Sequence, residues 1–242
     1  MADLVYRKVF NDLKDKIVKN EFPNKRLPDE RSLSEEYQVS RSSVKRALKV
    51  LADEGIIFKK RGSGTFINPL YMKNKTIFHY EGSNLGITDS LKSQGKTPKI
   101  KLLSFKVVPA NKEIQQDLFL SEGDFVYEIQ RLRLFDDQPF MIETGYIPIK
   151  IAPELTREIV EKSIFNYVED TINKSVTRSF LSILASPSNE QDQELLNLKP
   201  TEPVGVMEGI FFLDDGTPFE VSNMRLHYRY LRYNTFVMLN DH

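Results

Sequence analysis

Two arginines separated by one residue are the first feature of this sequence with a clear chemical use. Arg131 and Arg133 follow Phe125, Tyr127 and Ile129 at alternating positions, and alternate residues of a strand share one face. Two neighbouring guanidinium groups can hold a phosphate or a carboxylate through charge-assisted hydrogen bonds. A strand end with solvated arginines explains the same pair without a ligand, and the spacing alone leaves both interpretations open.

A second group of polar and basic residues is concentrated near the N-terminus. It consists of Ser40, Arg41, Ser42, Ser43, Lys45 and Arg46, and Arg61 and Gly62 follow in a basic, glycine-rich stretch. Arginine, lysine and serine neutralise phosphates or donate hydrogen bonds to base edges in the major groove of DNA. A glycine turn allows close backbone approach, so that Arg61 could enter a minor groove. A basic stripe alone is usually a solvated helical face, but the elements around this one favour DNA binding.

Those elements are expected to be a helix, a second helix, a turn, a third helix and a hairpin. Apolar residues recur at helical spacing over residues 6–17, and residues 27–30 combine proline with acids as helix starts do. Ser40 is a good N-cap for a third helix that runs to about Glu54 and is stopped by Gly55. Two short strands around a glycine turn come next. This order predicts a winged helix-turn-helix with the basic cluster at the start of its third helix.

Composition places a nucleic-acid partner on the first third of the chain alone. The 242 residues suffice for two domains, and their net charge is zero. Residues 1–70 contain 15 basic and 10 acidic residues, which gives this segment a net charge of +5. The rest of the chain therefore has a net charge of −5. The chain has no cysteine, which excludes disulfides and fits the cytoplasm. With three scattered histidines and no long apolar run, we expect no metal, no cofactor and no membrane partner.

The remainder contains an internal repeat. Residues 118–147 and 196–226 each read as a helix end, a long strand, an Asp-Asp turn and a return strand. Residues 163–170, between the copies, read as a helix. The fold class is therefore expected to be α+β, with a mixed, mostly antiparallel sheet built from two similar hairpins. In the second copy Gly209 and Phe211 take the places of the two arginines, so the architecture does not demand arginine there.

The N-terminal stretch resembles a known DNA-binding domain. The segment from Arg26 to Ile57, followed by Arg-Gly-Ser-Gly-Thr-Phe, is similar to that of the GntR family of transcriptional regulators. The resemblance implies DNA contacts from Arg31, Ser40, Arg41, Ser43 and residue 45, with Gly62 at the wing tip. The family usually has arginine at position 45, and this chain has Lys45. Lysine lacks the planar two-donor fork, so we expect different preferred operator bases.

The span from about Gly86 to Phe236 resembles the effector-binding (UTRA) domain of the HutC-type branch of the same family, whose fold is similar to chorismate lyase. Its motifs include Glu-Ile-Gln-Arg-Leu-Arg-Leu at 128–134 and Ser-Ile-Phe-Asn-Tyr at 163–167. The resemblance implies that an anionic ligand contacts Arg131, Arg133, Ser163, Tyr167 and the loop Thr88, Asp89 and Ser90.

The residues near that loop support the same ligand class only in part. Thr88 can cap a helix from Asp89, and free N–H groups at a helix start attract anions. The charge of Asp89 argues mildly against a phosphate there. Glu143 and Glu220 could accept hydrogen bonds from sugar hydroxyls, although a structural hydrogen bond or a solvated face explains each equally well. Three arginines of the tail mark either a pocket rim or a basic edge strand: Arg225, Arg229 and Arg232.

The sequence therefore predicts a regulator that acts as a homodimer on double-stranded DNA with a palindromic operator. Residues 1–69 would bind DNA, and residues 70–80 would form a linker. Residues 81–242 would form the dimer and bind a small anion, with a sugar phosphate as the leading candidate. A non-sugar carboxylate effector and a purely dimerising second domain stay open as alternatives. Catalysis is not expected, because no histidine lies beside a serine nucleophile and an orienting acid.

Overall fold

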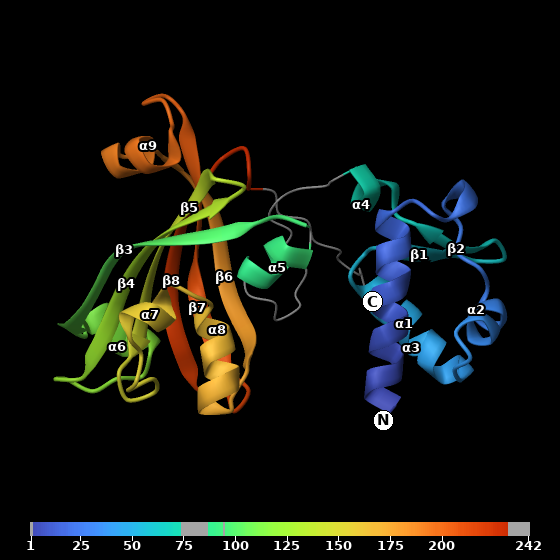
Figure 1. Cartoon of the computed structure of the whole chain (residues 1–242), viewed down its shortest axis with the longest axis horizontal. Helices are drawn as coiled ribbons and strands as arrows, with labels where there is room; N and C mark the ends of the chain where they lie inside the picture. The colour runs from blue at the N-terminus through green and yellow to red at the C-terminus, as the bar shows by residue number, and fades with distance from the viewer. Residues whose placement is uncertain (1, 74–86, 94, 232–242) are drawn as a thin grey trace, which may run out of the picture. The chain divides into compact units, whose positions relative to one another are not determined.

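The computed structural model describes residues 2–73, 87–93 and 95–231 of the chain. These residues fall into two compact units, with 2–73 in the first and the others in the second (Figure 1). Among the described helices, none has the length and apolar character needed to cross a membrane.

The first unit is a small helical bundle with a two-stranded wing. Its described elements are α1 (Ala2–Val18), the short 3-10 helix η1 (Pro23–Lys25), α2 (Glu30–Glu36), α3 (Arg41–Asp53), β1 (Ile57–Lys60), β2 (Gly64–Ile67) and α4 (Pro69–Lys73). Asp29 and Ser40 cap α2 and α3 by accepting hydrogen bonds from backbone N–H groups three residues on. Gly55 follows α3 with a φ of +68°, which favours glycine at a helix end. The predicted winged helix-turn-helix is confirmed.

A core of buried aliphatic side chains fixes the direction of α3 in this unit. Residues 44, 47, 48 and 51 of α3 are buried against α1, α2 and the wing. The main members are Val9, Leu13, Ile17, Leu33, Val44, Ala47, Leu48, Leu51, Ile57 and Ile67. Because these positions fill the inner face of α3, its polar side chains are left on the outer face.

The second unit is built on one six-stranded antiparallel sheet. Its strands are β3 (Pro98–Pro109), β4 (Phe125–Phe135), β5 (Gln138–Pro148), β6 (Val176–Pro187), β7 (Pro203–Leu213) and β8 (Pro218–His227), in the order β3-β4-β5-β8-β7-β6. The two hairpins of the internal repeat, β4–β5 and β7–β8, lie side by side at its centre through the β5–β8 pairing. Asp136 and Asp137 make the first turn with φ of +46° and +63°, which suits a two-residue hairpin. The predicted α+β class is confirmed.

Helices cover both faces of the sheet. They are α5 (Ile87–Ser93), α6 (Lys112–Asp117), α7 (Arg157–Val160), α8 (Ile164–Tyr167) with the π-helical turn η2 (Val168–Ile172), and α9 (Glu190–Leu196). We call the face that packs against α5, α7 and α8 the arginine face, because it carries Arg131 and Arg133. The opposite face packs against α6 and α9, which lie near opposite ends of the sheet (Figure 1).

Two boundaries differ from the sequence-based expectation. Residues 70–73, which were expected to open the linker, belong to α4, and Tyr71 and Met72 pack against the core of the first unit. The remaining linker residues lie outside the described part of the chain. Helix α5 begins at Ile87, so Thr88 lies in its first turn instead of capping a helix that starts at Asp89.

Candidate functional site

The start of α3 brings three serine hydroxyls together. Ser40 Oγ accepts a hydrogen bond from the backbone N–H of Ser43 at 3.2 Å. The hydroxyls of Ser42 and Ser43 lie 2.8 and 2.9 Å from that same oxygen. The cap therefore fixes the first turn of α3, and its hydroxyls and N–H groups lie where a phosphate would be attracted.

The basic residues of α3 that were predicted to contact DNA fall into two groups. Arg41 and Lys45 are exposed and one helical turn apart, so they share a face. Arg46 is also exposed, but its guanidinium carbon lies 4.0 Å from the centre of the Tyr6 ring, which holds it toward α1. Arg31 lies on α2, where its Nε is 3.0 Å from Glu35 Oε1.

The turn of the wing carries the remaining predicted cation, Arg61. Arg61 is exposed in the turn between β1 and β2, and Gly62 beside it has a φ of +70° with no atom near the place of a Cβ. The positive φ explains why glycine stands there. Lys59 Nζ lies 2.8 Å from Glu30 Oε1, which ties the wing to the start of α2. The predicted DNA-contacting residues thus lie on α2, on the start of α3 and on the wing of one compact unit.

Both arginines of the second unit converge on one carboxylate oxygen. Glu143 Oε2 lies 2.7 Å from Arg131 Nη2 and 2.9 Å from Arg133 Nε. Arg131 and Glu143 are cross-strand partners of β4 and β5, which explains the short approach. Exposed fractions are 3% for Arg131, 7% for Arg133 and 6% for Glu143. The arginines are therefore a buried pair that shares one carboxylate, and not a solvated strand end.

The same guanidiniums bind the segments that cover this face. Arg131 Nη1 donates to the backbone carbonyls of Val160 and Lys162 at 3.1 and 3.3 Å, at the junction of α7 and α8. Arg133 Nη1 donates to Thr88 Oγ1 of α5 at 3.3 Å. One buried donor, Arg131 Nε, has no partner among the described residues. The pair thus links the sheet to two separate helical segments.

A second buried carboxylate, Glu220, completes this cluster. It is 3% exposed and lies over Gly145, where an added Cβ would come 2.4 Å from Glu220 Oε1. No hydrogen-bond donor to it is found among the described residues. Burial and the negative charge of Glu143 raise the pKa of Glu220 to about 8, so it carries a proton at neutral pH.

The other two ionisable groups of the cluster respond to the same surroundings. Burial alone would raise the pKa of Glu143, but Arg131 and Arg133 lower it to about 2. Burial lowers the pKa of Arg131. We define Arg131, Arg133, Glu143 and Glu220 as the arginine cluster. With Glu220 protonated and both arginines charged, it holds one positive charge in excess.

The remaining predicted effector residues lie around the cluster. Ser163 caps α8: its Oγ accepts from the Asn166 N–H at 3.4 Å and lies 3.0 Å from Asn166 Oδ1. Ser163 follows Lys162, whose carbonyl binds Arg131. Tyr167 packs against the core beneath α8, and burial raises its pKa. Asp89 and Ser90 belong to α5, but their side chains lie outside the described part of the structure.

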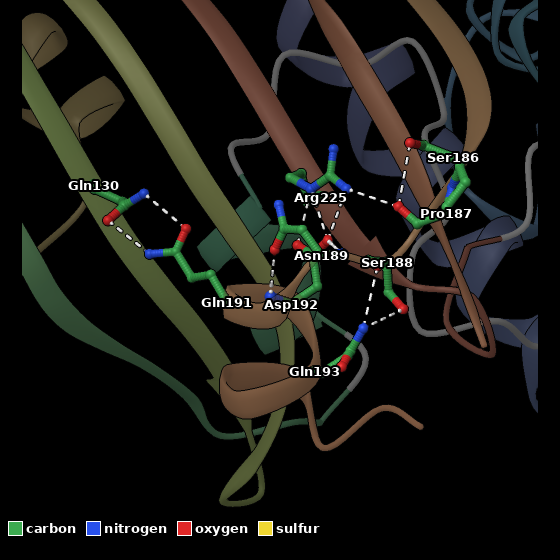
Figure 2. Close-up of polar contacts among 9 residues, drawn as sticks. All are labelled: Gln130, Ser186, Pro187, Ser188, Asn189, Gln191, Asp192, Gln193 and Arg225. Carbon is green, nitrogen blue, oxygen red and sulfur yellow. Dashed lines mark hydrogen bonds and ion pairs between the residues drawn. The ribbon is translucent and has the colours of Figure 1, made fainter. Parts of the chain in front are cut away.

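Arg225 is not at the rim of this cluster. Its cross-strand partner is Ile142, and its side chain points to the α9 side of the sheet (Figure 2). There Nε and Nη2 lie 2.8 and 2.7 Å from the two carboxylate oxygens of Asp192, which is 1% exposed. The pocket-rim interpretation of Arg225 is therefore wrong. Arg229 donates to Tyr228 Oη at 3.0 Å, and Arg232 lies outside the described residues.

The role of Asp192 was missed from the sequence. Asp192 and Asn189 form a reciprocal capping box at the start of α9. The spacing Asn-x-x-Asp could have indicated that helix start. Nothing local could have indicated an arginine 33 residues further on as its partner. Beside it, Gln191 and Gln130 join α9 to β4 through a pair of amide contacts (Figure 2).

Comparison with known proteins identifies both units. Residues 5–67 match the bacterial regulatory proteins of the gntR family, and residues 93–233 match the UTRA domain. The HTH-type transcriptional regulator GmuR of Bacillus subtilis (strain 168) is 32% identical over 91% of this chain and 92% of its own. The mannosyl-D-glycerate transport/metabolism system repressor MngR of Escherichia coli (strain K12) is 28% identical over 90% of this chain and 89% of its own.

A solved structure agrees over the full length. The crystal structure of the possible transcriptional regulator YydK from Bacillus subtilis subsp. subtilis str. 168 has a TM-score of 0.78 and 25% identity, and covers 98% of this chain and 99% of its own. The chain therefore belongs to the gntR family of bacterial regulatory proteins and carries a UTRA domain.

Proposed function

We propose that this chain is a cytoplasmic, dimeric repressor that binds a palindromic operator through α3 and the wing. A small anionic effector, a sugar phosphate, binds at the arginine cluster and weakens operator binding. The observation that carries this proposal is the convergence of two buried guanidiniums on a single carboxylate oxygen. A regulatory rather than catalytic role is supported by the family to which the chain belongs.

The arginine cluster already binds an anion, namely the chain's own Glu143. An incoming phosphate offers more acceptor oxygens than one carboxylate and can replace Glu143 at both guanidiniums. The excess positive charge of the cluster favours this exchange, and burial strengthens it because the surroundings screen charge weakly. A displaced Glu143 carboxylate can then accept hydrogen bonds from effector hydroxyls, as can Glu220.

Effector binding can reach the DNA-binding unit through the helical segments that the arginines hold. Arg133 contacts α5, the first described element after the connection between the two units, and Arg131 contacts the start of α8. An effector that binds these guanidiniums would replace the hydrogen bonds that hold α5 and the start of α8 against the sheet. The shift in operator affinity can be no larger than the difference in effector affinity between the two states.

Titration of operator binding tests the proposal. An operator is selected from a random duplex library, and its affinity for the full chain is measured with hexose 6-phosphates, the free hexoses and inorganic phosphate. We expect one hexose phosphate to weaken binding at least about tenfold, and the matching free hexose to have no effect. Arg133→Lys keeps the charge but loses the fork, and should abolish the response while DNA affinity stays unchanged. A response that survives in Arg133→Lys would contradict this site.

A carboxylate effector is the second candidate, because the cluster binds the carboxylate of Glu143 in this structure. MngR, named for a mannosyl-D-glycerate system, is a relative of this chain. Sugar acids and simple hydroxy acids therefore form a second arm of the same titration. If neither arm changes operator binding or the melting temperature, the second unit serves dimerisation alone.

A further inference from the structure

Ser222 of β8 has a buried hydroxyl that no described residue pairs with. It is 1% exposed, and its Oγ makes no hydrogen bond within the described part of the chain. Arg131 Nε is a second buried atom of this kind. Buried polar atoms are paired in the great majority of cases, because an unpaired one has lost its hydrogen bonds to water. The fold therefore gives no reason for a hydroxyl at position 222.

The strand register places Ser222 beside the arginine cluster. Its cross-strand partners are Gly145 on β5 and Gly209 on β7. Gly145 comes two residues after Glu143, and Ser222 comes two residues after Glu220. Because alternate residues of a strand share one face, Ser222 lies on the arginine face, at a position that neighbours both buried carboxylates of the cluster.

The surroundings of the two glycines show from which side a ligand can reach Ser222. At Gly209, the place of a Cβ is filled by the backbone carbonyl group of Phe180 on β6. At Gly145, the three atoms nearest to that place all belong to the Glu220 side chain. Backbone thus closes the β7 side of Ser222, and the arginine cluster borders its β5 side. A partner for the hydroxyl therefore has to come from the side of the cluster.

The polar groups at this position suit more than a bare anion. The Ser222 hydroxyl donates and accepts hydrogen bonds, and so does the protonated carboxyl group of Glu220. A phosphate or carboxylate group accepts hydrogen bonds, and the two guanidiniums already supply donors for it. A hydroxyl group of a ligand both donates and accepts, so it can pair with Ser222 and Glu220 at once. The arginine face therefore suits a ligand with hydroxyls beside its anionic end.

We propose that Ser222 binds a hydroxyl group of the effector and thereby selects a sugar phosphate over simple anions. The inference rests on the proposed function, because it requires the anionic end of the effector at Arg131 and Arg133. A hydroxyl that gains its hydrogen bond only in the complex adds that bond to the binding free energy. A simple anion leaves the same hydroxyl unpaired, and such a site rejects ligands that lack the matching group.

Removal of the hydroxyl tests the role of Ser222. Calorimetry without DNA measures the affinity of the full chain for hexose 6-phosphates, their monodeoxy analogues, inorganic phosphate and succinate. For the hexose 6-phosphate that the unaltered chain binds most tightly, Ser222→Ala should weaken binding at least about fivefold. The melting temperature should stay the same or rise, because alanine removes a buried hydroxyl without breaking a hydrogen bond of the fold.

Thr177→Val is the matched control. Thr177 Oγ1 is also a buried atom without a partner among the described residues, and it lies at the irregularity of β6 between Val176 and Arg178. Valine keeps the shape of threonine and removes the hydroxyl, so the melting temperature should again not fall, and effector affinity should stay unchanged. An equal loss of affinity in both variants would contradict a specific role of Ser222.

A deoxy analogue identifies the effector hydroxyl. One monodeoxy hexose 6-phosphate should bind the unaltered chain more weakly by about the same factor as Ser222→Ala binds the parent sugar phosphate. The Ser222→Ala variant should then bind this analogue and the parent equally, because both lack the same hydrogen bond. Unchanged affinity of Ser222→Ala for the parent, or losses that add for every analogue, would overturn the inference. So would succinate or inorganic phosphate that binds as tightly as the hexose 6-phosphate.

Effector selection and regulation can fail separately. Binding that depends on Ser222 but leaves operator affinity unchanged would sink the proposed function and leave this inference standing. An operator response and an effector affinity that both persist in Ser222→Ala would overturn this inference alone. If the unaltered chain binds no hexose 6-phosphate, both are wrong.

Discussion

Cations of the two units differ in what surrounds them. On α3, Arg41 and Lys45 are exposed on a helix whose opposite face is packed. On β4, Arg131 and Arg133 are 3% and 7% exposed and are bound by a carboxylate and by other protein oxygens. Exposed cations can be removed at little cost to the fold. Removing a buried cation costs much more stability, because its partner carboxylate is left charged, unpaired and shielded from water.

The same contrast separates the two hairpins of the internal repeat. Their first strands, β4 and β7, both have 11 residues, but β7 has Gly209 and Phe211 where β4 has the arginines. Phe211 packs edge-on against Phe165 of α8. At these two positions, one hairpin therefore meets the overlying segments with apolar contact, and the other meets them with charge. A buried charge costs stability where an apolar residue costs none, which points to a role beyond folding for the first hairpin.

The largest effect should come from breaking the buried pair. Arg131→Met leaves Glu143 with one arginine fewer and loses both carbonyl contacts, so we expect about 3–5 kcal/mol less unfolding free energy by urea titration. The double variant Arg131→Met with Glu143→Leu also removes the Glu143 carboxylate, and should recover much of the lost unfolding free energy. A loss below about 1 kcal/mol in the single variant would mean that the pair is solvated.

Removing an exposed cation should act on DNA binding alone. Arg41→Ala should weaken operator binding by about 1–3 kcal/mol and lower the salt dependence by about one charge, with an unchanged melting temperature. Lys49→Ala is the control, because Lys49 is exposed on the same helix but is paired with Asp53 near its far end. An equal loss of operator affinity in both variants would mean that the start of α3 attracts DNA only through non-specific charge.

The proton on Glu220 should appear in the pH dependence of stability. Its pKa is raised to about 8 in the folded chain, against an ordinary value of 4.5. Between these values the folded state holds the proton and the unfolded state has lost it, so stability falls as pH rises through this window, on the order of 1 kcal/mol per pH unit. Glu220→Gln should remove that slope in urea titrations at pH 6, 7 and 8. Glu208→Gln, at an exposed position of β7, should retain it.

The smallest effect should come from Lys45. Lys45→Arg restores the planar fork that the family usually has there, and should change operator affinity by about 1 kcal/mol or less while shifting base preference toward guanine. Binding of both proteins to a library of operator variants measures this. Identical preferences would place residue 45 on the phosphates only.

Local sequence was enough to predict elements and faces. Ser40, the Asp136–Asp137 turn and the alternation of Arg131 with Arg133 each depend on neighbours within a few residues, and each was predicted correctly. Glu143 was predicted as an effector ligand, yet its place as the counter-ion of both arginines follows from the β4–β5 register. The role of Arg225 could not be decided from the sequence for the same reason. Its partner Asp192 lies on a helix that packs on the other face of the sheet.

The sequence by itself determined the two-part order, the winged helix, the repeated hairpin and the residue types that can bind anions. These follow from periodicity, caps and turns, which act over a few residues. Tertiary structure decided which charges are buried, which carboxylate both arginines contact, and which helical segments they hold. Burial and pairing depend on segments far apart in the chain, and the free energy of a charge depends more on those surroundings than on its own residue type.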